Sequence, residues 1–427
     1  MCIRDRLEVL ESDYMIVSGC SIAMNTLPGE SMKIADVQVI RFSVEAEDYG
    51  TKWGYGQRGP KRRVPRGLIK ITTDDGESGF DTQYGWDGYY EPPSVEETEN
   101  IIKPLLVGED PRNIEKLWQW MMAHRGFSET TIGSIDCALW DLKGKLANSP
   151  TYQVLGGARD KVKAYASTYP NLGNPDVYAE HAKEAVARGY KAFKVHAYIF
   201  WDPINDCPAP GKPAFPKQDI EVCEAVRAAV GNDIVLMLDP WSVYTYQESL
   251  MVGRQLEKLD YYWLEHPMDE RRMEPYKQLT KELDINIMGP EMEPGSFYTR
   301  ANWAFQRASD MGRIDVSFGG ITGCRKAIAM YESLGMQCEM HVGGFANLAI
   351  LGSTTEEQCE YYERGLTKPD EDRDACPVFL KNPCDPLDNE GFVEIPKGPG
   401  LGIEFNWDYI QDNFLPDLSS KNVNFIG

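Results

Sequence analysis

The chain has 427 residues, of which 42% are hydrophobic and 26% charged, an ordinary composition for a globular protein with a sizeable core. Its formal net charge of −22 argues against a nucleic-acid or membrane partner, and no apolar run is long enough to cross a bilayer. The ten cysteines include no C-x-x-C pair, which is typical of reduced thiols in a cytoplasmic enzyme. We therefore expect a cytoplasmic enzyme that acts on a small molecule.

The first 31 residues do not fit the pattern of the rest of the chain. Glu8, Glu11 and Asp13 stand where a secretory signal needs positive charge. From Met32 onward, the run MKIADVQVIRF is typical of a strand. We treat residues 1–31 as an extension of doubtful origin and begin the fold at Met32.

Residues 32–157 predict a compact α+β unit. Two strand-like runs, KIADVQVIRFSV and RGLIKITTDDG, flank a loop rich in Gly, Arg and Lys. Helical patterns follow at Val95–Leu106, Ile114–Met122 and Ser134–Ala147. Strands followed by a run of helices indicate a separate N-terminal domain.

From residue 158 to residue 376, short apolar runs alternate with helical segments, which predicts βα units and a parallel sheet. The helical segments include Asp219–Val230, Tyr246–Leu259 and Ile321–Leu334. The strand candidates are KAYAS, AFKVHAY, IVLMLDP, YYWLEHP, INIMGPE, IDVSFGG and CEMHVGG. A Pro-rich insertion, Trp201–Pro216, interrupts the alternation. Residues 377–427 lack the βα pattern, and we expect this tail to pack back on the first domain.

Three acids recur at a regular spacing in this second region. Asp239, Glu265 and Glu291 each follow an apolar run, and successive acids are 26 residues apart, which is about one βα unit. The carboxyl ends of barrel strands are where active sites are built, so the three carboxylates are expected to converge. Such charges repel one another unless a hard divalent cation such as Mg²⁺ lies between them. For any single acid, a helix cap or an ion pair remains the alternative.

Two further pairs of polar residues are expected near the same strand ends. Lys194 and His196 lie two positions apart on AFKVHAY, so both side chains point to one face of the strand. Asp315 begins the IDVSFGG run and His341 lies in CEMHVGG, the next strand candidate. A buried aspartate that orients a histidine is a recurring form of general base. A core role for either histidine alone is the competing interpretation.

Together, these residues resemble the mandelate racemase-like branch of the enolase superfamily over nearly the whole chain from Met32. GSIDCALWDLKGKLANSPTYQVLGG is similar to the family's junction between capping domain and barrel, and FKVH to its K-x-K strand. MLDPW, WLEHP and GPE resemble its metal-ligand strands, IDVSFGGITG and MHVGG its Asp/His strands, and YYERG the strand with a substrate-contacting glutamate. The resemblance implies an α/β fold, a TIM-type (β/α)7β barrel over residues 158–376. An α+β capping domain would be formed by residues 32–157 and the C-terminal segment 377–427.

The resemblance also implies the chemistry of the site. Asp239, Glu265 and Glu291 would bind Mg²⁺ as the cofactor, and the ion would chelate the substrate carboxylate and stabilise an enediolate. His341, oriented by Asp315, would remove the proton α to the carboxylate or protonate the departing 3-hydroxyl.

Substrate contacts are implied on β/α loops and on the first loop of the capping domain. Glu363 in YYERG would hydrogen-bond the substrate, and Glu360 would take this part if the short motif is misaligned. The family's first loop, here Asp48–Arg66, would cover the site, and Lys52 and Trp53 within it are candidate substrate-binding residues.

Two positions depart from the family's pattern. Lys194 matches the first lysine of K-x-K and would neutralise the substrate carboxylate, but His196 replaces the second, so lysine-based racemisation is not expected. His196 remains a candidate base or a residue that binds hydroxyls. The family often has Asn two residues after the first metal ligand, whereas this chain has Trp241, which indicates a differently shaped substrate pocket.

We interpret the chain as a lyase, a Mg²⁺-dependent dehydratase that converts an aldonic or aldaric acid to a 2-keto-3-deoxy acid. An epimerase, racemase or cycloisomerase on a related hydroxy acid or lactone shares the first proton abstraction and stays open. A glycosidase with Glu265 and Glu291 as acid and nucleophile would leave Asp239 and Lys194 without roles, and a non-catalytic sugar-acid binding protein is the remaining alternative.

Gly54–Gly59 match G-x-G-x-x-G, but they lie in a loop with no helix after it, so we interpret them as a lid. A homo-oligomer is expected because symmetric assembly is common.

Overall fold

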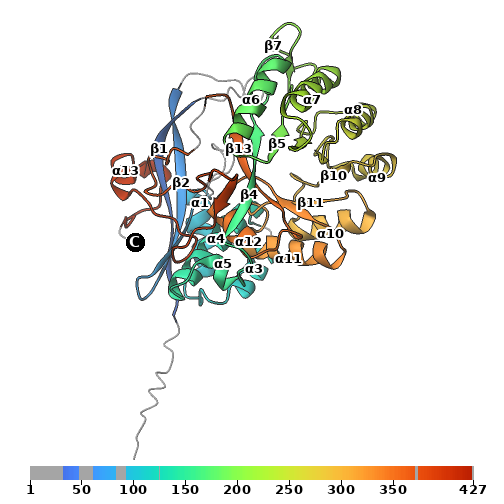
Figure 1. The fold of residues 1–427 in the computed structure, drawn as a ribbon. Helices are drawn as coiled ribbons and strands as arrows, with labels where there is room; N and C mark the ends of the chain where they lie inside the picture. Colours follow the sequence, from blue (N-terminus) through green and yellow to red (C-terminus); the bar gives the residue numbers. More distant parts are fainter. Residues whose placement is uncertain (1–31, 48–60, 83–92, 125, 371–373, 426–427) are drawn as a thin grey trace, which may run out of the picture.

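A computed structural model of the chain describes residues 32–47, 61–82, 93–124, 126–370 and 374–425. Figure 1 shows two parts, an antiparallel sheet with short helices and a set of parallel strands wrapped by helices. This arrangement confirms the predicted α/β barrel with an N-terminal capping domain. Among the described residues, no helix has both the length and the hydropathy that a membrane span requires.

The capping domain begins with an antiparallel sheet of order β1-β2-β3. Its strands are β1 (Ile34–Glu47), β2 (Lys61–Thr73) and β3 (Ser78–Asp81). Val37 pairs with Ile71 and Val39 with Ile69, and all four side chains are fully buried. Apolar residues at every second position therefore build one buried face of this sheet.

Short helices cover the sheet of the capping domain. They are α1 (Val95–Glu97), the π-helical turn η1 (Thr98–Ile102), α2 (Lys103–Leu106), α3 (Ile114–Ala123), α4 (Glu129–Leu146) and α5 (Thr151–Val154). Helix α4 begins after Ser128, whose hydroxyl accepts the N–H of Thr131 at 3.1 Å. It packs closely on β3, where a Cβ at Gly79 would lie 2.2 Å from the carbonyl oxygen of Ala138. Glycine is needed there for the close approach of strand and helix.

The second domain is built on parallel strands that follow one another around a barrel. They are β4 (Lys161–Thr168), β5 (Ala192–Val195), β8 (Val235–Leu238), β9 (Trp263–Glu265), β10 (Asn286–Met288), β11 (Gly312–Ile314), β12 (Cys338–Met340) and β13 (Tyr361–Thr367). Strand β13 pairs in parallel with β4, and a bridge between Met288 and Met311 links β10 to β11. Chain order and spatial order therefore agree, as a (β/α) barrel requires.

Helices alternate with these strands, as the sequence pattern predicts. They are α6 (Pro175–Ala187), α7 (Pro216–Val230), α8 (Tyr246–Lys258), α9 (Met273–Glu282), α10 (Ser296–Gln306), α11 (Gly320–Ser333) and α12 (Phe345–Gly352). Helix α8 starts with a capping box between Thr245 and Glu248. The insertion Trp201–Pro216 contains a short antiparallel pair, β6 (Trp201–Asp202) and β7 (Cys207–Pro208), and ends at the start of α7.

The predicted strand IDVSFGG is wrong in its position. Strand β11 ends at Ile314, so Asp315 follows the strand rather than beginning it. Gly319 and Gly320 have positive φ angles, and α11 begins at Gly320. The residues between the strand and this helix therefore form the loop at the barrel's carboxyl end, which places Asp315 on the side where barrel sites are built.

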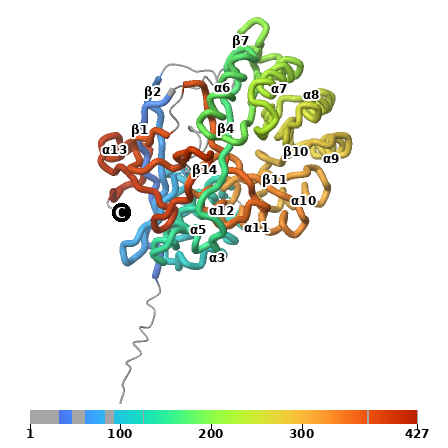
Figure 2. Tube along the Cα trace, viewed as in Figure 1, coloured from blue at the N-terminus to red at the C-terminus, as the bar shows by residue number. Residues whose placement is uncertain are grey.

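The C-terminal segment contacts both domains (Figure 2). It contains β14 (Phe392–Glu394), which pairs antiparallel with β4, then α13 (Trp407–Asp412) and the 3-10 turn η2 (Pro416–Leu418). Against β1, Leu415 donates its N–H to the carbonyl of Arg41 at 2.8 Å, and the Ser419 hydroxyl accepts the N–H of Arg41 at 2.8 Å. Ser420 donates its N–H to the carbonyl of Val39. The segment thus covers an edge of the capping sheet.

Helix α4 also joins the capping domain to the barrel. Its Asp136 accepts hydrogen bonds from the N–H and the hydroxyl of Thr322, at 2.8 and 2.7 Å, in the first turn of α11. Glu129 accepts the N–H of Gly295 at 2.8 Å and that of Ser296 at 3.2 Å, where α10 begins. Carboxylates are favoured at helix N-termini because the helix dipole is positive there. Asp136 is fully buried, and burial raises its pKa to about 7.

Candidate active site

The candidate site lies at the carboxyl ends of the barrel strands. A cavity of about 330 Å³ opens there. Its lining comes from β5, β13 and the loops after β8, β10 and β12 and consists of Lys194, His196, Asp239, Glu291, His341, Val342, Glu363, Gly365 and Leu366. Most of the charged residues predicted from the sequence therefore meet in one place, because parallel strands bring their carboxyl ends to one face.

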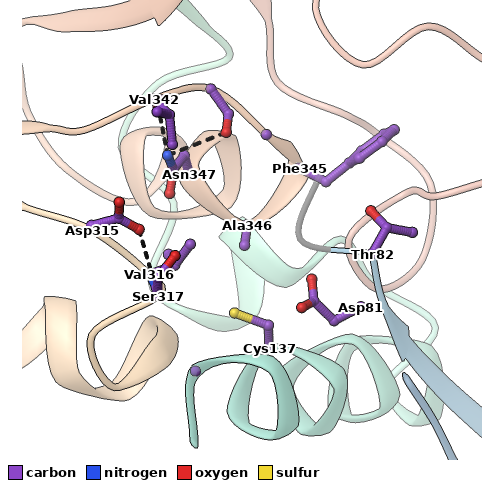
Figure 3. A pocket seen from close by; sticks show the side chains of 13 residues that line it. Asp81, Thr82, Cys137, Asp315, Val316, Ser317, Val342, Phe345, Ala346 and Asn347 are labelled. Atoms are coloured by element: carbon purple, nitrogen blue, oxygen red, sulfur yellow. Dashed lines mark hydrogen bonds between the residues drawn. The ribbon is translucent and has the colours of Figure 1, made fainter. Parts of the chain in front are cut away.

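A second cavity of about 440 Å³ adjoins the first, since Val342 lines both. Figure 3 shows its lining from two domains. Asp81, Thr82, Gly133 and Cys137 come from the capping domain, and the remaining residues come from the loops after β11 and β12 and from the start of α12. The capping domain therefore supplies one wall of the space beside the strand-end residues.

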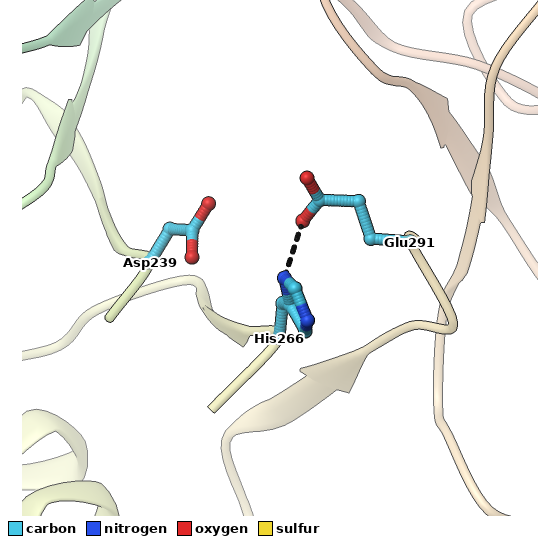
Figure 4. Close-up of side chains that lie close together, drawn as sticks. All are labelled: Asp239, His266 and Glu291. Atoms are coloured by element: carbon cyan, nitrogen blue, oxygen red, sulfur yellow. Dashed lines mark ion pairs between the residues drawn. The ribbon is translucent and has the colours of Figure 1, made fainter. Parts of the chain in front are cut away.

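Asp239, His266 and Glu291 form a buried cluster at the strand ends (Figure 4). One ligand atom from each lies within 4.8 Å of the other two. His266 Nδ1 is 3.1 Å from Glu291 Oε2. Burial would lower the pKa of His266, but the charges of Glu270 and Glu291 raise it to about 10. These acids therefore favour positive charge at this point.

Glu265, at the end of β9, lies beside this cluster and is bound by two buried cations. Its Oε2 accepts hydrogen bonds from Lys194 Nζ and Trp263 Nε1, both at 3.0 Å. Its Oε1 is 2.7 Å from Arg313 Nε, but this contact is not aligned as a hydrogen bond, so both atoms lack a well-directed partner. Of the acids predicted as metal ligands, Asp239 and Glu291 share the cluster, whereas Glu265 is turned toward Lys194 and Arg313.

Lys194 and Arg313 also hold Glu363. Lys194 Nζ is 2.8 Å from Glu363 Oε1, and Arg313 Nη2 donates to Glu363 Oε2 at 2.5 Å. Burial alone would lower the pKa of Lys194, but the carboxylates of Glu265 and Glu363 hold it well above its usual range. Burial would raise the pKa of Glu363, but Lys194 and Arg313 bring it well below its usual range. Lys194 therefore adds positive charge between these two carboxylates.

His341 and Asp315 form the pair that the sequence pattern predicts. His341 Nδ1 is 2.7 Å from Asp315 Oδ2, and His341 Nε2 is 2.8 Å from Glu291 Oε1. Burial would lower the pKa of His341, but Glu291 and Asp315 raise it to about 10. Asn347 donates from Nδ2 to the carbonyl of His341 at 2.9 Å and to that of Val342 at 2.7 Å, which fixes the backbone of the loop. The imidazole is thus oriented by a carboxylate and can carry a proton.

His196 is held by hydrogen bonds at both ring nitrogens. Its Nδ1 is 2.8 Å from the carbonyl oxygen of Thr168, which can only accept, so this nitrogen carries a hydrogen. Its Nε2 is 3.0 Å from Asp239 Oδ2. Asp239 Oδ1 accepts the N–H of Trp241 at 2.8 Å. This geometry suits His196 to orienting Asp239.

The residues present fit a metal ion. In the part of the chain that the structure describes, Lys194 and Arg313 lie beside the site, and neighbouring carboxylates also raise the pKa values of His266 and His341. The buried carboxylates of the site are those of Asp239, Glu265, Glu291, Asp315 and Glu363. Glu291 Oε2 and His266 Nδ1 are buried without a hydrogen bond, although they lie 3.1 Å apart. A divalent cation bound by these carboxylates would offset their charge in place of the histidine protons.

The other residues predicted from the sequence to contact substrate are Glu360, Trp241, Lys52 and Trp53. Glu360 directly precedes β13, where Tyr262 donates to its carboxylate at 3.3 Å, and it is not among the described residues that line the cavity. Trp241 is half-buried and is not among the described residues that line the two cavities. Lys52 and Trp53 lie outside the described residues.

Sequence reasoning missed three charged residues of this region. His266 directly follows Glu265 and turns into the cluster with a φ of 43°, and the dipeptide His-Pro after a strand was the available signal. Arg313 is fully buried in β11, where an arginine within an apolar strand was the signal. Glu270 precedes α9 and is buried below the Glu291 loop, and no pattern in the sequence marks it.

Two family models match the sequence of this chain. The family model "Enolase C-terminal domain-like" matches residues 177–409. The model "Mandelate racemase / muconate lactonizing enzyme, N-terminal domain" matches residues 59–156. Together the two matches cover the capping domain from residue 59 and the barrel from residue 177.

Individual relatives are similar over most of their length. Arabinonate dehydratase of Saccharolobus solfataricus is 32% identical over 370 residues, which cover 83% of this chain and 90% of that protein. D-galactarolactone cycloisomerase of Agrobacterium fabrum is 28% identical, over 82% of this chain and 91% of that protein. The crystal structure of D-glucarate dehydratase from Agrobacterium tumefaciens complexed with magnesium matches with a TM-score of 0.80 and 35% identity. That match covers 90% of this chain and all of the other.

Proposed function

Because the chain belongs to the enolase superfamily, in its mandelate racemase and muconate lactonizing branch, we propose that it is a lyase that dehydrates a sugar acid. The proposed substrate is an aldonic or aldaric acid with hydroxyls at C2 and C3, and the product is the 2-keto-3-deoxy acid. One observation carries this proposal. A carboxylate-oriented histidine, His341, shares a buried cavity with the fixed positive charge of Lys194 and with a metal-binding cluster.

We expect Mg²⁺ to be held by Asp239 and Glu291, with Glu265 as the third ligand. Bound there, the ion would supply positive charge beside the substrate carboxylate and so increase the acidity of the adjacent C–H group. Lys194 adds a second positive charge that burial keeps unscreened. The magnesium in the related D-glucarate dehydratase structure supports this expectation.

The Asp315–His341 pair is proposed to move the proton. The charge of Glu291 raises the pKa of His341, and a cation bound by Glu291 would reduce that effect. His341 Nε2 could then take the proton from C2, with Asp315 stabilising the imidazolium through Nδ1. The imidazolium then returns this proton to the 3-hydroxyl, which leaves as water. The C2–H and C3–O bonds break, a C2=C3 bond forms, and the resulting enol tautomerises to the 2-keto acid.

The surroundings of Lys194, on β5, and of His196, just after it, favour elimination over racemisation. A racemase needs a second base that meets the other face of the same carbon. Lys194 stays protonated between Glu265 and Glu363, and His196 is hydrogen-bonded at both nitrogens. Cycloisomerase chemistry, carried out by one related protein, remains the second candidate because it also begins with loss of the α proton.

The direct test is a pooled screen of aldonic and aldaric acids with and without Mg²⁺, read out as 2-keto-3-deoxy acid by semicarbazide absorbance. We expect one acid to give a signal that EDTA abolishes. If no acid gives a signal, α-proton exchange in D₂O separates the alternatives. Exchange without dehydration would favour epimerisation or cycloisomerisation, and the absence of exchange would reject the proposed chemistry.

A further inference from the structure

Glu270 is a buried carboxylate between β9 and α9 that none of the site motifs includes. It accepts three consecutive backbone N–H groups of the loop after β10. Its Oε1 accepts from Glu291 at 2.6 Å, and its Oε2 accepts from Met292 at 2.7 Å and from Glu293 at 3.2 Å. A Cβ at Gly289 would lie 3.2 Å from Glu270 Oε1, so glycine leaves room for this close approach.

The carbonyl groups of the same loop are bound by a buried cation. Arg300, on α10, is 1% exposed. It donates to the carbonyl oxygen of Glu291 at 2.8 Å and to that of Glu293 at 2.5 Å. The backbone donors of the loop are thus bound by Glu270 and its acceptors by Arg300. Two buried side chains of opposite charge therefore fix the segment from which the Glu291 side chain projects.

We propose that Glu270 is a positioning residue that sets the backbone of residues 291–293 and thereby fixes where Glu291 presents its carboxylate to a metal ion. This inference rests on the proposed function, because it takes Glu291 to be a metal ligand. A carboxylate suits the task since it offers two acceptor oxygens, whereas a neutral amide offers one. The buried charge of Glu270 is partly offset by His266, whose Nε2 lies 3.8 Å from Glu270 Oε2, and a cation bound by Glu291 would lower its cost further.

The test is Glu270→Gln. The glutamine keeps the size of the side chain but turns an NH₂ group toward one of the backbone N–H groups, so the loop must shift. We expect the dissociation constant for Mn²⁺, measured from the EPR signal of the free ion, to rise about 10- to 100-fold. With substrate, the Mg²⁺ concentration for half-maximal activity should rise similarly, while kcat at saturating Mg²⁺ should change much less.

Glu339→Gln is the matched control. Glu339, on β12, is also fully buried and also accepts consecutive backbone N–H groups, from Glu360 at 2.8 Å and Tyr361 at 3.0 Å. Those groups lie at the other end of the barrel strands, so this variant should lose stability without losing Mn²⁺ affinity. Equal weakening of Mn²⁺ binding in both variants would show a general effect of destabilisation and would overturn the inference.

The wild-type titration separates the two levels of the proposal. If wild-type protein binds no Mn²⁺, the metal site and the proposed function fail together. If it binds Mn²⁺ and Glu270→Gln binds within twofold of wild type, only the part assigned to Glu270 fails. Should the variant not fold, hydrogen exchange of wild-type protein replaces it. Mn²⁺ should then slow exchange of the Met292 and Glu293 amides, and unchanged rates would overturn the inference.

Discussion

Two buried histidines of this chain have very different surroundings. His341 lies between Asp315 and Glu291, whereas His181 lies on α6 with its Nε2 3.1 Å from the Thr367 hydroxyl. Burial lowers the pKa of His181, since the nearby carboxylate of Glu184 only partly offsets the loss of solvent. Burial alone therefore does not help a histidine to hold a proton, whereas the carboxylates around His341 do help it.

We predict that His341→Asn lowers turnover of the identified substrate by about 10²- to 10⁴-fold, the range for loss of a general acid–base group. The fold and Mn²⁺ binding should persist, which circular dichroism and the EPR titration check. His181→Asn is the control, because it removes a buried imidazole outside the cavity and should keep most of the activity. Turnover of His341→Asn close to that of wild type would remove His341 from its proposed role.

The third metal ligand can be decided by two neighbouring substitutions. Mg²⁺ prefers oxygen donors, so Glu265→Gln should weaken Mg²⁺ binding more than His266→Asn does. In the structure, Glu265 is paired with Lys194 and Arg313, whereas His266 already lies in the cluster, so the two variants test different assignments. Calorimetric titration with Mg²⁺ and Mn²⁺ measures both variants. A larger loss in His266→Asn, above all for Mn²⁺, would assign the ligand to the imidazole.

At the scale of elements, α4 and the loop after β11 fit together because one residue has no side chain. A Cβ at Gly133 would lie 2.3 Å from the carbonyl oxygen of Val316, a backbone atom that cannot swing away. Val316 follows Asp315 directly. The packing of the capping helix is therefore coupled to the position of the Asp315–His341 pair.

We predict that Gly133→Ala destabilises the protein by about 1–3 kcal/mol, as overpacking generally does, and lowers kcat by shifting Asp315. Thermal unfolding and steady-state kinetics provide the measurements. Gly211→Ala serves as the comparison, since a Cβ at Gly211 meets nothing within 4 Å. A lowered melting temperature with unchanged kcat and KM would show that the loop moves independently of the chemistry.

The sequence predicts the elements of the barrel better than the ends of its strands. Hydrophobic alternation marks seven of the eight barrel strands, β13 being indicated only by the family resemblance, and the spacing of acids places Asp239 and Glu291 at one edge of the sheet. The strands themselves are short, and His196 and His341 come just after β5 and β12. The hydrophobic pattern does not indicate where the hydrogen bonds between neighbouring strands end.

Side-chain partners within the site could be predicted only in part. The Asp315–His341 pair follows from neighbouring strands, but the turn of Glu265 toward Lys194 and Arg313 depends on which charges meet in a buried space. That choice reflects an electrostatic balance among many groups and not the local order of residues. His266 enters the cluster through a backbone angle in the left-handed region, which a non-glycine residue adopts only when its surroundings impose it.

For the whole molecule, the joint between domains is expected to respond to pH through Asp136. Burial raises the pKa of this carboxyl from 3.8 to about 7. The stability that comes from its bound proton is complete below pH 3.8 and is lost as the pH rises toward 7. The native protein should thus lose about 2 kcal/mol of this contribution between pH 5 and pH 7.

Asp136→Asn isolates this effect, because an amide does not titrate and can still accept the N–H of Thr322. The melting temperature of the variant minus that of wild type should increase as the pH rises from 5 to 7. Above pH 7 this difference should level off. Differential scanning fluorimetry across this range measures it. Parallel curves for the two proteins would mean that Asp136 keeps the same charge throughout.

During synthesis, β1 leaves the ribosome long before the residues that cover it. Arg41 and its partner Ser419 are 378 positions apart in the chain. At about 5–20 residues per second, roughly 20–80 s pass between them, and for that time the edge of β1 is open to wrong strand pairing. The capping sheet and the barrel strands are therefore both synthesised before the segment that covers the edge of β1. Chaperones that shield strand edges should matter most at this late stage, when the rest of the fold is already present in the nascent chain.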